Sequence, residues 1–104
     1  MKQTIHLLIC LLILLACQNK IRQTKEIIVY GSNNCHHCVD FKAKLDSVEF
    51  TYDFRDVEFN EMMNNEMIYK VRASGVQGGF KYPVLDIEGN ILIAPELQAV
   101  LDLM

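Results

Sequence analysis

Residues 26–41, EIIVYGSNNCHHCVDF, contain the features that decide the fold. The first six residues form a short apolar run, rich in β-branched side chains and ending at Gly31, which predicts a buried strand. Residues 32–34, SNN, predict a loop in which the serine or the last asparagine caps a helix. Apolar side chains then recur at three- or four-residue spacing over residues 35–48, which predicts an amphipathic helix. A Cys-x-x-Cys pair therefore lies where a strand leads into a helix.

The rest of the chain predicts further elements of both kinds. Alternating side chains favour a half-exposed strand, helical spacing favours two more helices, and Glu88-Gly89 favours the turn of a hairpin. The expected elements are a strand over 50–57, a helix over 60–73 with Asn60 as its cap, strands over 83–87 and 90–93, and a helix beginning at Pro95. The order β-α-β-α-β-β-α predicts an α/β fold, a single small domain with a mixed four-stranded sheet.

The first 25 residues differ in composition from the rest. Residues 7–16, LLICLLILLA, form an uncharged apolar run preceded by Lys2, and the run is too short to span a bilayer, which takes about 20 residues. This pattern is typical of a signal peptide, whereas a buried core helix would need polar positions at helical spacing. Residues 14–17, LLAC, resemble the lipobox of bacterial lipoproteins, which implies cleavage before Cys17 and lipid on its sulfur. An ordinary secretory signal with a free Cys17 is the alternative.

These features predict three segments and a location. We expect a lipoprotein signal peptide over 1–16, a lipidated cysteine and tether over 17–25, and the folded domain over 26–104. The protein would then be held by its lipid at a membrane outside the cytoplasm, in the bacterial cell envelope. All thirteen Asp and Glu residues but only six of the ten Lys and Arg residues lie in 26–104, so the domain is acidic. No basic patch indicates a nucleic-acid partner.

The cysteine pair predicts redox chemistry. Cys10 leaves with the signal peptide, so Cys35 and Cys38 remain as one pair in a compartment where disulfides persist. A pair two residues apart closes too short a loop to stabilise a fold. We expect Cys35, at the helix N-terminus, to react as a thiolate stabilised by free backbone N–H groups and the helix dipole. Cys38, one turn later, would resolve the mixed disulfide.

The strand, loop and cysteine pair VYGSNNCHHC, together with Tyr82-Pro83 and the following VLDIEGN, resemble the glutaredoxin branch of the thioredoxin superfamily. The resemblance extends over residues 26–104. It implies a thioredoxin-like fold and a thiol–disulfide oxidoreductase that acts on protein thiols and disulfides and is reset by an unknown redox partner. It also implies that Pro83 is cis and faces the cysteines, and that the backbone of Tyr82 pairs with an extended substrate.

The two histidines and several departures from the family refine this expectation. His37, directly before the second cysteine, resembles the motif of oxidising periplasmic members, which implies that it stabilises the reduced thiolate. His36 is expected to face solvent or substrate. Ser32 replaces the Lys or Arg of glutathione-using members, and residues 81–83 and 94–96 replace their Thr-Val-Pro and Gly-Gly, which argues against glutathione. The buried acid of thioredoxins is also absent, because Val29 holds its position.

The same four residues, Cys35 to Cys38, allow an alternative function, a copper- or zinc-binding lipoprotein on the same scaffold. Structural zinc takes four Cys or His ligands, and four adjacent residues on one helical turn cannot all converge on one tetrahedral ion. A two-thiolate Cu(I) site, or a metal shared between two chains, stays open. For the leading function we expect no cofactor and no metal.

Overall fold

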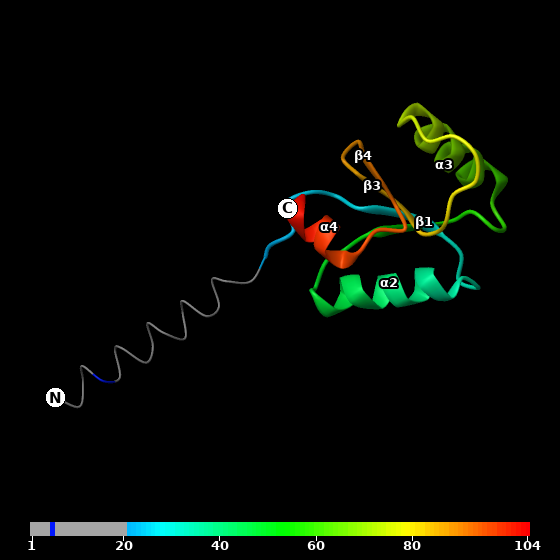
Figure 1. The fold of residues 1–104 in the computed structure, drawn as a ribbon. Coiled ribbons are helices and arrows are strands. Elements are labelled where there is room, and N and C mark those ends of the chain that lie inside the picture. The colour runs from blue at the N-terminus through cyan, green and yellow to red at the C-terminus, as the bar shows by residue number, and fades with distance from the viewer. Residues whose placement is uncertain (1–4, 6–20) are drawn as a thin grey trace.

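The structure is a computed structural model that describes Ile5 and residues 21–104. Figure 1 shows its elements in chain order, which are β1 (Ile28–Gly31), α2 (His36–Ser47), β2 (Asp53–Asp56), α3 (Glu61–Ala73), β3 (Val84–Ile87), β4 (Asn90–Ile93) and α4 (Leu97–Asp102). The predicted order of strands and helices is confirmed. The signal peptide, apart from Ile5, and Cys17 lie outside the described residues. Within the described part of the chain, no helix combines the length and the apolar character needed to cross a bilayer.

The four strands form one mixed sheet in the order β2-β1-β3-β4. β1 pairs in parallel with β2 and antiparallel with β3, while β3 and β4 form the expected antiparallel hairpin. The hairpin turn places Glu88 at φ 49° and Gly89 at φ 95°. Two successive positive φ values match the twist of paired strands, and glycine accepts such a value without strain.

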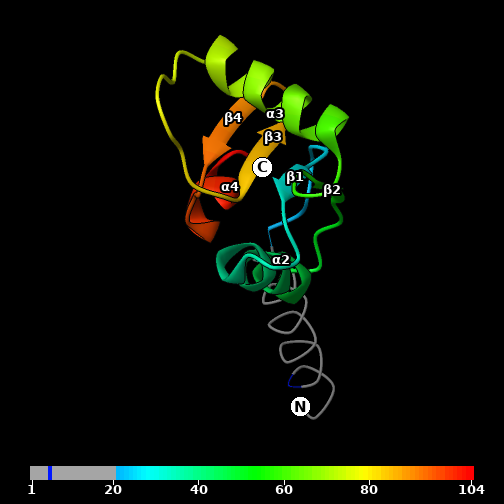
Figure 2. The same ribbon diagram turned by 90° about the vertical axis from the view of Figure 1, so that its right-hand side faces the viewer.

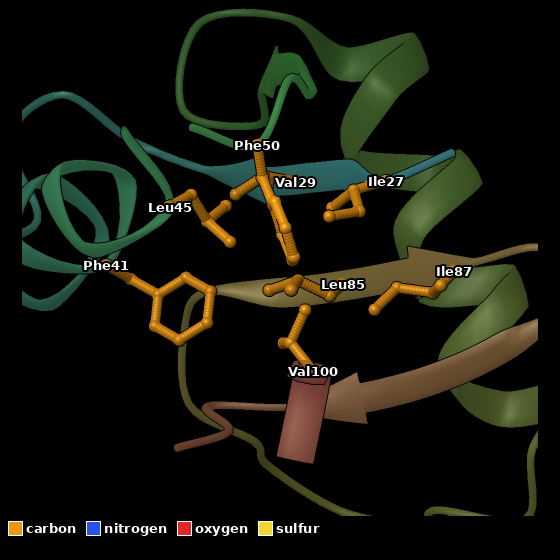
Figure 3. Close-up of a cluster of buried hydrophobic side chains, with 8 residues drawn as sticks. All are labelled: Ile27, Val29, Phe41, Leu45, Phe50, Leu85, Ile87 and Val100. Carbon is orange, nitrogen blue, oxygen red and sulfur yellow. The ribbon is translucent and has the colours of Figure 1, made fainter. Parts of the chain in front are cut away.

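Helices cover both faces of the sheet and create two apolar cores. α2 and α4 lie against one face and α3 lies against the other (Figures 1 and 2). The first core, drawn in Figure 3, consists of Ile27, Val29, Phe41, Leu45, Phe50, Leu85, Ile87 and Val100. The second core consists of Tyr30, Val57, Met67, Val71 and Val84. Neighbouring residues of β1 and β3 thus belong to opposite cores, because successive strand side chains point to opposite faces.

A buried ion pair lies beside the second core. Asp86 on β3 is 9% exposed, and its carboxylate accepts a hydrogen bond of 2.6 Å from the ammonium group of Lys70 on α3. The backbone N–H of Gly89 donates to the same carboxylate at 2.8 Å. Burial alone would raise the pKa of Asp86, but the bonds from Lys70 and Gly89 hold this pKa below its ordinary value.

Three predicted boundaries are wrong, for identifiable reasons. The first helix begins at His36 with Cys35 as its N-cap, so neither predicted loop residue caps it. The second strand begins only at Asp53, because the side-chain amide of Gln23 takes both backbone hydrogen bonds of Thr51, at 2.8 Å each.

The predicted start of the last helix at Pro95 is also wrong. α4 begins at Leu97 with Glu96 as its N-cap, after Ala94 turns the chain with a φ of 43°. In contrast, the predicted cap of α3 is confirmed. Asn60 accepts a hydrogen bond of 3.1 Å from the backbone N–H of Met63 through its side chain.

Candidate active site

The two cysteines differ in exposure, and both are free thiols. Cys35 is half-buried and occupies the N-cap position of α2, where the first turn of the helix leaves backbone N–H groups unpaired. Cys38 lies one turn later and is fully buried, at 0% exposure. Burial, together with a hydrogen bond to Cys35, raises the pKa of Cys38 to about 11. The cysteine expected to react first is thus the more accessible of the two.

The backbone at the end of β1 lies directly against Cys38. A Cβ atom added to Gly31 would lie 2.6 Å from the Cys38 sulfur, so only glycine fits at this position without a shift of its neighbours. The backbone of Ser32 favours the Cys38 thiolate and so lowers the pKa of Cys38 against the effect of burial. The carbonyl of Ser32 accepts a hydrogen bond of 3.2 Å from the Cys35 amide. The main chain of Ser32 is therefore bonded to Cys35 and adjoins the glycine that packs against Cys38.

Side chains from two other elements brace this loop. The Ser32 hydroxyl and the Asn34 side-chain amide both donate to the carboxylate of Glu58, which follows β2 in the sequence, and the Asn34 bond is 3.0 Å long. On the other side, the ammonium group of Lys42 on α2 donates to the Asn33 side-chain oxygen at 2.7 Å. The loop that leads into Cys35 is thus fixed from β2 and from α2.

Sequence reasoning missed Gly31, Glu58 and Lys42 as residues of this site. Gly31 could have been found, because a glycine at the end of a strand, directly before a cysteine-bearing loop, is a signal of close backbone approach. Glu58 and Lys42 carry no such signal, since charged residues at exposed positions are the ordinary composition of a surface. Only the fold brings their side chains to residues 32–34.

Tyr82 and Pro83 line a groove that His37 also lines, while neither cysteine is among its lining residues. The Tyr82–Pro83 peptide bond is cis, as the resemblance implied. A cavity of about 310 Å³ lies between this segment, one face of α2 and the connection from β4 to α4. His37 and Lys44 line it from α2, and Lys81 lines it from the proline segment. The structure therefore brings His37, Tyr82 and Pro83 to one groove.

The two histidines have different surroundings. His37 is exposed and lines the groove, whereas the side chain of His36 is 84% exposed and lies 3.1 Å from the carboxylate of Asp40. The rings of the two histidines meet edge to face, with centroids 6.3 Å apart. His36 faces solvent, which is one of the two placements that the sequence left open.

The structure bears on a metal site built from three or more ligands of one chain. Within the described residues, no three Cys, His, Asp or Glu side chains are placed to hold an ion. Cys35 and Cys38 contact one another, but His36 engages Asp40 and His37 lies on the groove. The donor set that adjoins Cys35 and Cys38 is therefore two thiols, which suits reversible disulfide formation.

Comparisons with known proteins identify the fold. The structure is similar to that of the thioredoxin-like protein BC3987, with a TM-score of 0.63, 22% sequence identity, and coverage of 76% of this chain and 100% of that one. A point mutant of the same protein matches with a TM-score of 0.62, 22% identity, and coverage of 75% and 97%. At this identity the likeness shows a thioredoxin-like fold. No curated protein sequence matches the chain.

A match to a family model identifies the family of the chain. The glutaredoxin model matches residues 27–93, a span from the residue before β1 to the end of β4 that includes both cysteines and the cis proline. The match extends over more than half of the 104 residues. The chain therefore belongs to the glutaredoxin family, and this supports a thiol–disulfide oxidoreductase-like function.

Proposed function

We propose that the protein is an enzyme that exchanges disulfides with protein thiols through Cys35 and Cys38. The observation that carries this proposal is the unequal burial of the two sulfur atoms at a helix N-terminus. Cys35 is partly exposed at a helix N-terminus, a position that favours a thiolate, while Cys38 has no exposed surface.

In the reducing direction, the Cys35 thiolate attacks one sulfur of a substrate disulfide. The substrate disulfide breaks, one substrate thiolate leaves, and Cys35 becomes joined to the other half. Cys38 then loses its proton and attacks the Cys35 sulfur, which releases the second substrate thiolate and leaves a Cys35–Cys38 disulfide. The substrate has gained two electrons and the enzyme has lost two, so a dithiol partner must return them. Oxidation of a substrate dithiol is the same sequence in reverse.

The groove supports an extended polypeptide as the substrate. Within the described part of the chain, the backbone N–H and C=O of Tyr82 make no hydrogen bond to another backbone group. They are therefore available to a strand laid along the segment that holds the cis proline. Glutathione is not favoured, because Ser32, where other members have a basic residue, is already hydrogen-bonded to a carboxylate.

We further propose that a lipid on Cys17 holds the domain at the cell envelope. The support is the LLAC sequence after the apolar run. A single acyl chain binds membranes weakly, so stable attachment requires more than one chain or a second contact.

Two cysteine variants test the enzyme proposal. Cys35→Ser is expected to abolish exchange with a disulfide-bonded protein, whereas Cys38→Ser is expected to accumulate a mixed disulfide that is visible on a non-reducing gel. Cys35→Ser should accumulate none, because Cys38 is buried. If the purified protein neither reduces nor oxidises a protein disulfide, or if Cys35→Ser rather than Cys38→Ser traps the substrate, the assignment is wrong.

The direction of exchange follows from the reduction potential. His37 is proposed to stabilise the reduced state and so to make the disulfide a stronger oxidant. Equilibration of the protein with a dithiol–disulfide buffer measures this potential. A value near the oxidising end supports the role of His37, and a thioredoxin-like value, on the order of −270 mV, would indicate a reductase instead.

A further inference from the structure

Ser32 connects Glu58 to both cysteines. Its hydroxyl donates to the Glu58 carboxylate, and its carbonyl accepts from the Cys35 amide at 3.2 Å. The residue before it, Gly31, places the backbone against the Cys38 sulfur, because a Cβ on Gly31 would lie 2.6 Å from that sulfur. Ser32 is only 6% exposed, so water does not readily replace a lost partner of its hydroxyl. The Glu58 side chain, outside the cysteine helix, is therefore bonded to the residue whose backbone lies next to Cys38.

Glu58 is itself held in place. The carboxylate of Asp56 accepts hydrogen bonds from the backbone N–H groups of Glu58, at 2.8 Å, and Phe59, at 3.2 Å, which fixes the turn after β2. No Lys, Arg or His in the described part of the chain forms an ion pair with Glu58. Its partners are the donors of Ser32 and Asn34. The exposed carboxylate of Glu58 therefore holds the loop by accepting its hydrogen bonds, and it is not part of a surface salt bridge within the described residues.

We propose that Glu58 is a positioning residue for Cys38, which acts by holding Ser32 so that its backbone N–H faces the Cys38 sulfur. The inference rests on the proposed exchange reaction, in which Cys38 must ionise to attack the mixed disulfide. The carboxylate does not touch the reacting sulfur atoms in this arrangement. It holds in position the loop whose N–H group stabilises the Cys38 thiolate. Burial and the charge of Cys35 oppose the ionisation of Cys38, and Lys42 favours it.

Positioning and direct electrostatics predict opposite effects of Glu58→Ala. Removal of a negative charge near a thiol would by itself lower the pKa of that thiol. Release of Ser32 would instead weaken a hydrogen bond to the thiolate and raise the pKa of Cys38. Glu58→Gln separates the two effects, because its amide oxygen still accepts from Ser32 and Asn34 while the charge is lost.

The experiment follows the Cβ chemical shift of isotope-labelled Cys38 by NMR across pH, in the full chain carrying Cys35→Ser so that the partner thiol does not titrate. Glu58→Ala is expected to raise the pKa of Cys38 by about one unit, about tenfold less thiolate at a fixed pH, and Glu58→Gln is expected to leave it unchanged or slightly lower. Glu61→Ala, in the same acidic segment but without a hydrogen bond or ion pair within the described residues, is the matched control and should change nothing.

An unchanged or lowered pKa of Cys38 in Glu58→Ala would overturn the inference, and so would equal values in Glu58→Ala and Glu58→Gln. If Glu58→Ala does not fold, Ser32→Ala removes the same link from its other end. The same rise supports the inference, and no rise overturns it. The NMR titration does not depend on turnover, so a shifted pKa in a protein that exchanges no disulfides would refute the proposed function and leave the role of Glu58 standing.

Discussion

Gly31→Ala should destabilise the reduced protein because a methyl group has no space beside Cys38. The added Cβ would lie 2.6 Å from the Cys38 sulfur and 3.2 Å from its Cβ, with Phe54 at 3.6 Å. Real Cβ atoms do not approach other atoms as closely as 2.6 Å, and Cys38 is fully buried on a helix, so its short side chain cannot simply move aside. Gly31 does not adopt a positive φ, so the effect is steric and not a matter of backbone strain.

The expected magnitude combines two opposing contributions. Overpacking a buried site costs about 1–3 kcal/mol, while exchange of glycine for alanine stabilises by about 0.4–1 kcal/mol through the unfolded chain. We therefore expect a net loss of about 1–2 kcal/mol in the free energy of unfolding. For a domain of this size that corresponds to a fall in Tm of about 5–10 °C. Thermal and denaturant unfolding under reducing conditions would measure it.

Two companion variants make this prediction specific. Gly79→Ala is the matched control, because a Cβ at Gly79 would meet no atom within 4 Å, and it should be neutral or slightly stabilising. In a Cys38→Ala background, which removes the sulfur, Gly31→Ala should cost clearly less than in the parent protein. A loss of stability no greater than that of Gly79→Ala, or an equal loss with and without the Cys38 sulfur, would refute the steric explanation.

Three further substitutions test other parts of the structure. Asp86→Asn should lower the free energy of unfolding by about 2 kcal/mol at neutral pH. Because the pKa of Asp86 is lowered in the folded state, this difference from the parent protein should shrink as the pH falls below about 4. A difference that does not depend on pH would contradict this. Asn60→Ala should lower the unfolding free energy by about 1 kcal/mol through loss of the α3 cap, and an unchanged denaturant midpoint would argue against the cap. His37→Ala should make the reduction potential more negative by on the order of 30 mV in a redox-buffer equilibration, and an unaltered potential would remove His37 from the proposed mechanism.

The order of elements was predictable because each element carries a local signal. The run ending at Gly31, the spacing of apolar residues after Cys35 and the Glu88-Gly89 turn each specify a strand, a helix or a hairpin from a few neighbouring residues. The boundaries were less predictable because long-range contacts decide them. Thr51 leaves the strand pattern only because Gln23, far away in the sequence, binds its backbone.

The residues of the candidate site also fall into those that carry a local sequence signal and those that only long-range contacts bring together. The cysteine pair and Pro83 could be identified from a motif and its spacing. They lie at one end of the sheet because the last residues of β1 pair with the first residue of β3. Glu58 could not be identified, because its effect passes through the hydroxyl and then the backbone of Ser32. No sequence pattern encodes a contact between two polar residues that the fold alone brings together.

The proton on Cys38 links the burial of this cysteine to the order of the two steps of the proposed exchange. With its pKa near 11, raised by burial and by the hydrogen bond to Cys35, Cys38 keeps its proton at neutral pH. In the proposed exchange, Cys35 becomes joined to the substrate, so its charge and its hydrogen bond no longer oppose ionisation of Cys38, while the Ser32 backbone and Lys42 still favour it. We therefore expect the pKa of Cys38 to fall at that step. On this proposal the buried thiol becomes more reactive at the step in which it has to attack, without any change in the fold.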